Sequence, residues 1–426
     1  MNVGNITNIG TRAAEIFIKS QENLSSTRFV QDTVTNWLPK AVFSRSKADF
    51  AEMSFLEFIE SAIFYFSLPI LGEKVFRNGL FKAIQPKNIR NAVNKEIPNK
   101  VSEILSNKNL TKEIKNQAIT TKAGILLACL AIPVAEYTLS FAKNLFTLKT
   151  FKKSNFNNIA NLDKNQNENE DKAQQERVEK SAKKHLKTAG ILSALGVLSG
   201  LALAKYGAKS DKLVNLSKNI IEPGKALASK ISPKYEKLKK LISSFSLDFA
   251  NNKGKLALSK GQLGLTALVG LFGYSAAASD RGKLDVLEVW TRVPLVVLYT
   301  TFGSEWLEKG FIKQLSKNKE YKDLISKDAN GKLSVPKLEQ LPELAKKLSI
   351  KNGVDYKTQY KKLLSQKTIT TAIPYAFSIL GMGFTLSAIT RFWTQYRYNH
   401  MPKNKKTDTV LTFNKSLPKQ FSAFDK

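Results

Sequence analysis

Carboxylates within apolar stretches are the residues whose positions could support chemistry in this chain. Glu57, Glu60, Glu136 and Glu288 each lie in a run of apolar residues, and Arg292 follows Glu288 by one helical turn. A charge inside a membrane helix is costly, so such residues are typical of a proton or cation pathway. The alternative is structural: Glu288 and Arg292 form an ion pair within one helix, and Glu57 lies near the start of a span. The spacing favours the structural alternative.

The sequence contains few residues that could form other kinds of site. The single cysteine, Cys129, excludes an internal disulfide and a cysteine metal cage. His185 and His400 have no second candidate ligand at a recognised spacing, and the sequence lacks phosphate-loop, zinc-protease and serine-hydrolase motifs. We therefore expect no catalytic, cofactor-binding or metal site, and predict a protein that is not an enzyme.

The charge balance indicates an anionic partner. Lys and Arg number 67 against 35 Asp and Glu, a formal net charge of +32. Phospholipid headgroups and nucleic acid are the two usual partners of such a surface, and an acidic protein is a third. Of these we expect a bilayer with anionic headgroups, and consider nucleic acid the weaker choice.

Six apolar segments of about 16–21 residues predict helices at the lower length limit for crossing a membrane. They are Ser54–Gly72, Ala123–Phe141, Thr188–Ala204, Leu263–Ala278, Val286–Gly303 and Ile369–Ile389. The alternative is a soluble helical bundle. It is strongest for the first and fifth segments, which contain charges. It is weakest for the third and sixth; in the third, Gly196 and Gly200 form the small-residue face of a closely packed membrane helix.

The stretches between these segments are polar or amphipathic. Leu213–Phe245 has apolar residues at helical spacing, interrupted at Pro223 and Pro233, and many lysines. Such helices suit the surface of an anionic membrane, or form a solvated arm. Asn161–Glu179 is polar and lacks aromatic residues, which indicates a disordered or loosely helical linker.

Aromatic and basic residues follow two of the apolar segments. Trp306 follows the fifth, and Arg391, Trp393, Tyr396 and Arg397 follow the sixth. Aromatic side chains mixed with arginine can stack on nucleic-acid bases. Directly after an apolar helix, anchoring at the membrane interface is the simpler interpretation.

An internal repeat is the most informative pattern. Leu56–Lys82 aligns without gaps onto Leu287–Lys313, which places Glu57 on Glu288. The motif R-x-K-x-D precedes both copies, displaced by a short indel, and an Ile-Thr-Thr to Thr-Leu-Ser stretch follows both. The residues are Arg45, Lys47 and Asp49 with Arg281, Lys283 and Asp285, then Ile119 to Ser140 with Ile369 to Ser387. Equivalent spans would point the same way, so the repeats are predicted to be parallel.

These patterns predict an all-α, polytopic membrane protein with about six spans and long basic loops, placed in a bacterial cytoplasmic membrane. The expected regions are an N-terminal amphipathic part, repeat 1, a central part with one span, repeat 2 with a preceding span, and a basic tail: 1–43, 44–150, 151–262, 263–400 and 401–426. The expected function is a membrane scaffold that binds anionic lipid or an acidic partner. The alternatives are a transporter or channel using Glu57 and Glu288, and a soluble nucleic-acid-binding protein.

Overall fold

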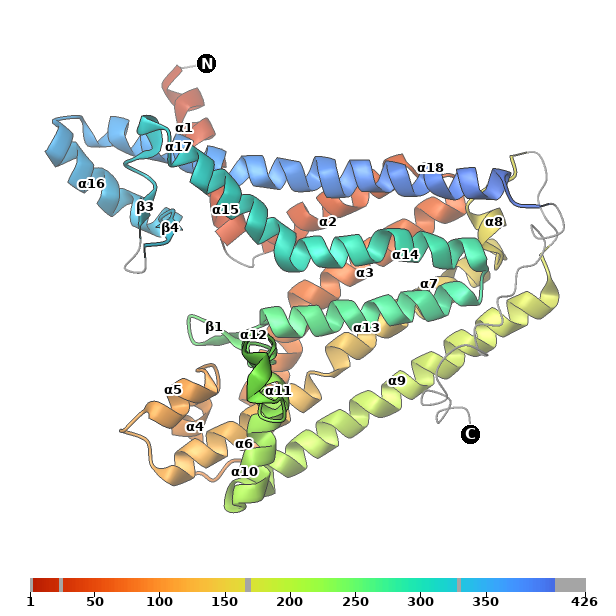
Figure 1. The fold of residues 1–426 in the computed structure, drawn as a ribbon, viewed down its shortest axis with the longest axis horizontal. Coiled ribbons are helices and arrows are strands. Elements are labelled where there is room, and N and C mark those ends of the chain that lie inside the picture. Colours follow the sequence, from red (N-terminus) through yellow and green to blue (C-terminus); the bar gives the residue numbers. More distant parts are fainter. Residues whose placement is uncertain (1–2, 23–25, 165–169, 328–330, 403–426) are drawn as a thin grey trace. The chain divides into compact units, whose positions relative to one another are not determined.

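The computed structural model describes residues 3–22, 26–164, 170–327 and 331–402 and confirms the all-α class (Figure 1). Within these residues, β structure is confined to two short antiparallel hairpins. These are β1 (Ala250–Asn252) with β2 (Lys255–Ala257), and β3 (Ser326–Lys327) with β4 (Leu333–Ser334). The predicted basic tail lies almost entirely outside the described residues.

The chain forms two compact units. Unit 1 comprises residues 1–43 and 298–392, and unit 2 comprises residues 44–297 and 393–426. The boundaries fall before α3, at the end of α14 and within α18. Each unit is therefore assembled from segments that are distant in the sequence.

Unit 2 contains the long helices that position the candidate site. Its elements are α3 (Lys47–Ser67) continued by the π-helix η1 (Leu68–Phe81), α4 (Arg90–Glu96), α5 (Val101–Ser106), α6 (Lys112–Ala128), α7 (Ala131–Phe151), α8 (Phe156–Ile159), α9 (Lys172–Tyr206), η2 (Gly207–Lys209), α10 (Asp211–Ile221), α11 (Pro223–Ala228), η3 (Pro233–Tyr235), α12 (Glu236–Ser243), β1, β2, α13 (Lys260–Ser279), α14 (Lys283–Leu298) and the second half of α18 (Leu386–Asn399).

Local sequence signals set the ends of these helices. The Ser46 hydroxyl accepts a hydrogen bond from the backbone N–H of Asp49 and caps α3, and Asp171 caps α9 in the same manner. Pro223 and Pro233 occupy first-turn positions of α11 and η3, where a missing N–H is tolerated. The predicted interruptions at both prolines are confirmed. The polar stretch 161–179, predicted as a linker, forms the start of α9 from Lys172 on.

Close helix packing in unit 2 depends on glycine. α9 packs on α6 and α7, and α13 packs on α7 (Figure 1). The backbones of Gly124 in α6 and Gly200 in α9 touch, and a Cβ at Gly196 would lie 2.7 Å from the carbonyl oxygen of Leu127. Any larger residue would force α9 away from α6. The small-residue face predicted for this segment is the face that packs.

Unit 1 is a smaller helical assembly. Its elements are α1 (Val3–Glu22), α2 (Ser26–Val42), η4 (Tyr299–Gly303), α15 (Ser304–Leu315), η5 (Lys319–Tyr321), β3, β4, η6 (Leu338–Gln340), α16 (Leu341–Asn352), α17 (Tyr356–Phe377), η7 (Ser378–Thr385) and the first half of α18 (Leu386–Asn399). Ile18, Leu341 and Leu363 are fully buried in its core. Lys367 forms an ion pair with Glu22 at 2.7 Å, which ties α17 to α1.

Four helices, rather than the six predicted segments, are long and apolar enough to cross a membrane in the described residues. They are Lys47–Phe81, Lys112–Phe151, Lys172–Lys209 and Tyr356–Asn399. The fourth segment lies in α13 and is short and rich in glycine and alanine. The fifth lies in α14 and η4 and contains Glu288 and Arg292, whose charges lower its hydropathy.

Candidate functional site

A network of buried charges in unit 2 joins side chains of α3 and α7 to the turn between α13 and α14 and the start of α14. Arg281, which is 2% exposed, forms an ion pair with Glu52, and its Nη2 lies 2.7 Å from Oδ2 of Asp285. Lys143 of α7 approaches Oε2 of Glu52 at 3.7 Å, and the Thr147 hydroxyl donates a hydrogen bond to Oε1 at 2.6 Å. Burial opposes the charge of Arg281, but the Asp285 and Glu52 carboxylates outweigh it and raise its pKa above the ordinary value.

A second arginine joins this network from the start of α3. Arg45 donates from Nε to Oδ2 of Asp49 at 3.3 Å. Its two Nη atoms lie 3.1 and 3.3 Å from the two carboxylate oxygens of Glu288, a bidentate arrangement. The guanidinium groups of Arg45 and Arg281 lie 5.3 and 5.8 Å from the centre of the Phe156 ring, close enough for a cation–π interaction.

The two arginines are related by sequence spacing. Each pairs with an aspartate four residues later in the R-x-K-x-D motif, and a glutamate follows that aspartate by three residues. Each glutamate pairs with the arginine of the other motif. We call this set the cross-paired network; it consists of Arg45, Asp49, Glu52, Lys143, Arg281, Asp285 and Glu288. By this spacing Glu288 corresponds to Glu52, whereas the gapless alignment pairs it with Glu57.

Three of the carboxylates predicted as a site lie close together elsewhere in unit 2. Glu57 and Glu60 of α3 are near enough to Glu136 of α7 to interact with it electrostatically. The Tyr274 hydroxyl of α13 donates a hydrogen bond to Oε1 of Glu136 at 3.0 Å. Oε2 of Glu136 is buried and has no hydrogen-bond partner among the described residues. A Cβ at Gly270 would lie 2.9 Å from Cγ of Glu136, so this glycine makes room for the side chain.

The remaining predicted partners differ from the expectation. Glu288 pairs with Arg45, where the sequence suggested Arg292, and Arg292 is half-buried. Lys122, directly before the second apolar segment, forms a buried ion pair with Asp248. Burial raises the pKa of Asp248, although Lys122 opposes that shift. Neither Arg45 nor Asp248 could be assigned as a partner from local spacing.

The predicted interface anchors are mostly exposed. Trp306 is 64% exposed, and the Trp393 and Tyr396 rings stack on each other with their centres 5.6 Å apart. The Arg397 guanidinium lies 5.0 Å from the centre of the Trp393 ring. Arg391 differs, because it is buried.

Two further observations bear on chemistry. Among the described residues, no group of three or more His, Cys, Asp and Glu side chains could hold a metal ion. A surface hollow of about 540 Å³ lies between α6 and α10, and Lys112, Lys115 and Lys218 are among its lining residues. Comparisons with protein families, curated proteins and solved structures give no match.

Proposed function

We propose that the protein is a non-enzymatic integral membrane protein. Its long apolar helices span a bilayer, and the basic surfaces at their ends bind anionic headgroups or an acidic partner. Its role is then to organise the membrane or to hold a partner at its surface. The excess of lysine suits the anionic inner leaflet of a bacterial cytoplasmic membrane.

The main observation that supports this proposal is the exposure of the apolar half of α9. Leu195 and Leu198 are 52% and 63% exposed, and Ile191 and Leu192 are similarly open. No charge interrupts Thr188–Ala204, which is about 17 residues, or about 25 Å of helix. That is close to the roughly 30 Å of a hydrocarbon core. A continuous apolar surface of this length is typical of contact with lipid rather than with water.

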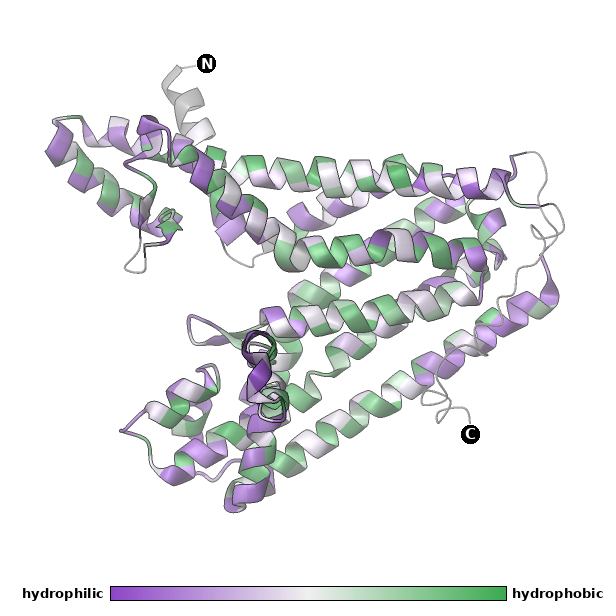
Figure 2. Ribbon diagram, viewed as in Figure 1, coloured by the Kyte–Doolittle hydropathy of each residue, from purple (hydrophilic) through white to green (hydrophobic). Residues whose placement is uncertain are grey.

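The other half of α9 is polar. Residues 172–187 carry six basic and two acidic side chains, and Figure 2 shows the change from hydrophilic to hydrophobic along the helix. Gln174 in this half donates towards the carbonyl of Arg281 at 3.4 Å. The cross-paired network therefore lies beside the polar half of α9, outside the proposed hydrocarbon layer, and its buried charges are stabilised by one another.

We also propose that the chain contains a parallel duplication. This proposal is supported by the pairing of the two motifs, in which the glutamate of each motif binds the arginine of the other. A duplicated R-x-K-x-D-x-x-E unit that packs on its copy generates two equivalent ion pairs of this kind. Both α3 and α14 start at this network and continue into a π-helical stretch, η1 and η4. On this proposal Glu52 and Glu288 are the equivalent carboxylates.

Extraction with alkaline carbonate tests membrane insertion. Carbonate releases proteins held at a membrane by charge and leaves spanning helices in the lipid. We expect the expressed chain to stay in the membrane pellet after carbonate and to be released by detergent. A peripheral protein in the same preparation serves as the control. Full release of the chain by carbonate would contradict the proposal.

A second candidate function is proton transfer through the bilayer by Glu136. The favouring observation is its buried Oε2, which has no hydrogen-bond partner among the described residues and lies near two further carboxylates. A carboxyl group in this position can accept a proton and release it to a neighbouring carboxylate. This is the transporter alternative with a different residue set, since Glu288 is held by Arg45.

Proton flux into reconstituted vesicles tests this candidate. We expect Glu136→Gln to reduce the flux to the level of protein-free vesicles, because the amide keeps a hydrogen bond with Tyr274 but carries no exchangeable acid proton. Glu113→Gln, at an exposed carboxylate of α6, is the matched control and keeps the wild-type flux. Equal fluxes for wild type, Glu136→Gln and empty vesicles would rule the candidate out.

A further inference from the structure

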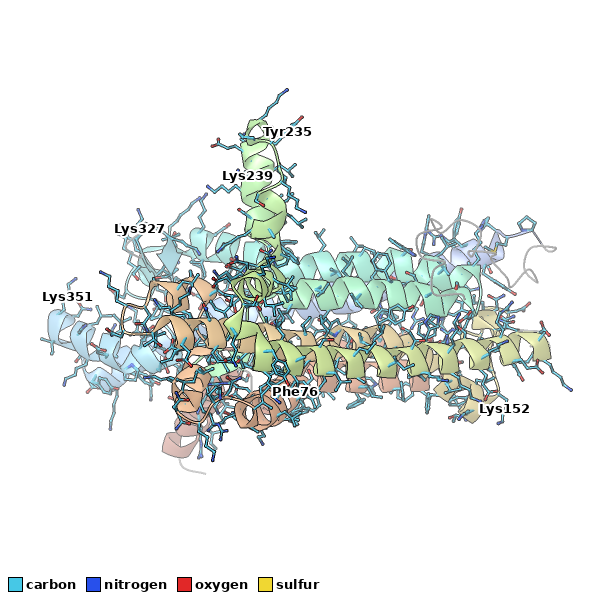
Figure 3. All side chains as sticks on the ribbon, turned by 90° about the horizontal axis from the view of Figure 1, so that it is seen from below. Phe76, Lys152, Tyr235, Lys239, Lys327 and Lys351 are labelled. Carbon is cyan, nitrogen blue, oxygen red and sulfur yellow. The ribbon has the colours of Figure 1, made fainter. Side chains whose placement is uncertain are left out.

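A short helical hairpin projects from unit 2 between α9 and α13. It consists of α11, a tip that contains η3, and α12, and it covers residues 223–245; we call it the basic arm. Gly224 holds its two sides together, because its backbone N–H donates to the carbonyl of Phe245 at 3.0 Å and a Cβ at this position would collide with the carbonyl of Ile242. Figure 3 shows the arm extending away from the long helices, with Tyr235 near its tip.

The surface of the arm combines exposed apolar groups with unneutralised positive charge. Its exposed large apolar residues are Leu227, Tyr235, Leu238, Leu241 and Phe245. The arm contains six lysines and a single glutamate. Among the described residues, Lys225 pairs with Glu222 at 2.6 Å, and the other five lysines of the arm have no carboxylate partner. Leucines flanked by lysines on one exposed face are typical of a helix at an anionic membrane surface.

The path of the chain places the arm at one end of the proposed membrane helix. The uncharged part of α9 ends at Ala204, Lys205 and Lys209 follow, and α10 leads directly into the arm. After the arm the chain enters α13 at Lys260. Within unit 2 the arm runs across the direction of α9 in Figure 3. A helix in the headgroup layer has this orientation, because it lies in the membrane plane while spanning helices cross it.

We propose that the basic arm lies in the anionic headgroup layer of the bilayer that α9 spans. Leu238 and Leu241 enter the boundary between headgroups and acyl chains, and the lysines of α12 bind lipid phosphates. This inference rests on the proposed membrane insertion and identifies the surface that recognises anionic lipid. Nucleic acid would also attract the lysines, but it would leave the exposed leucines in water, so lipid is the better partner.

Depth-dependent fluorescence quenching tests whether the basic arm lies in the anionic headgroup layer. The full chain carries Cys129→Ala and Leu241→Cys, with an environment-sensitive fluorophore on the new thiol. It is reconstituted into phosphatidylcholine vesicles with and without about 30% phosphatidylglycerol, both containing the same fraction of spin-labelled lipid. We expect quenching to be about threefold stronger in the anionic vesicles. Equal quenching in the two kinds of vesicle overturns the proposal.

Two charge variants of the labelled chain distinguish binding by the lysines of the arm from attraction by the overall positive charge of the protein. Lys237→Glu, Lys239→Glu and Lys240→Glu together are expected to reduce quenching to the level found in neutral vesicles. The matched control makes the same change at exposed lysines outside the arm, Lys346→Glu, Lys351→Glu and Lys357→Glu, and keeps the wild-type difference. The proposal fails if the arm variant behaves like the control.

Carbonate extraction and the quenching measurement together distinguish this inference from the proposed function. If the chain stays in the membrane after carbonate but shows no anion-dependent quenching, the proposal for the basic arm is wrong and membrane insertion still holds. If carbonate releases the chain, both the proposed membrane insertion and the proposed location of the basic arm are wrong. A single-stranded oligonucleotide added without lipid to the detergent-solubilised labelled chain is expected to leave the emission unchanged. A change of emission with the oligonucleotide, combined with equal quenching in the two kinds of vesicle, assigns the surface to nucleic acid and overturns the proposal.

Discussion

Replacing Arg281 with leucine is expected to lower the free energy of unfolding by about 3–5 kcal/mol, since the buried Asp285 loses its arginine partner and Glu52 keeps only the weaker contact with Lys143, at 3.7 Å. Arg281 and Glu52 are almost fully buried, so water cannot compensate. The measurement is unfolding of the purified chain in detergent micelles, with wild type and variant compared under the same conditions. The matched control is Lys183→Met, which removes an exposed ion pair with Glu179 and is expected to change stability by no more than about 1 kcal/mol.

A double-mutant cycle shows that the loss comes from the pair. Glu52→Gln combined with Arg281→Leu is expected to be less harmful than the sum of the single changes, with a coupling of about 1–3 kcal/mol. The equivalent pair of Arg45 and Glu288 is more exposed, with side chains 13% and 10% accessible, so its coupling is expected to be smaller. An Arg281→Leu variant as stable as the Lys183→Met control would show that the network does not stabilise unit 2.

Two lysines in the middle of the apolar stretch of α9, residues 188–204, are expected to prevent its insertion into the membrane. A lysine at the centre of a membrane helix raises the free energy of insertion by roughly 2.5–3.5 kcal/mol, so Leu195→Lys with Leu198→Lys adds about 5–7 kcal/mol. In water the same changes would have little effect, because both leucines are at least half-exposed. The measurement is the fraction of the chain inserted, followed with glycosylation acceptor sites on either side of α9.

The matched control for α9 is a leucine exposed outside the apolar stretch. Leu216 of α10 is 49% exposed and follows the proposed span, so Leu216→Lys is expected to leave insertion unchanged. If the double α9 variant inserts as well as this control, Leu195 and Leu198 do not lie in the hydrocarbon core, and the proposed span of α9 is contradicted.

The sequence alone determined the features that depend on neighbouring residues. Hydropathy along the chain predicted the helical class and the location of the four helices long and apolar enough to span a membrane in the described residues, because backbone hydrogen bonds within a helix are local. Pro223 and Pro233 marked the helix boundaries, and Gly196 and Gly200 marked the face of α9 that packs on α6. The number of helices long and apolar enough to span was predicted less well, since two segments carry charges or small residues that lower their hydropathy.

The tertiary structure decided which charges meet. Arg45 and Glu288 are 243 residues apart, and no local rule joins them, so the sequence offered the nearer Arg292 instead. Glu52 was missed because a glutamate in the first turns of a helix is ordinary; its spacing from Asp49, repeated between Asp285 and Glu288, was the signal that could have found it. Local composition determines where helices form, but helix packing determines which buried ions pair, because packing removes the water that would otherwise solvate each charge.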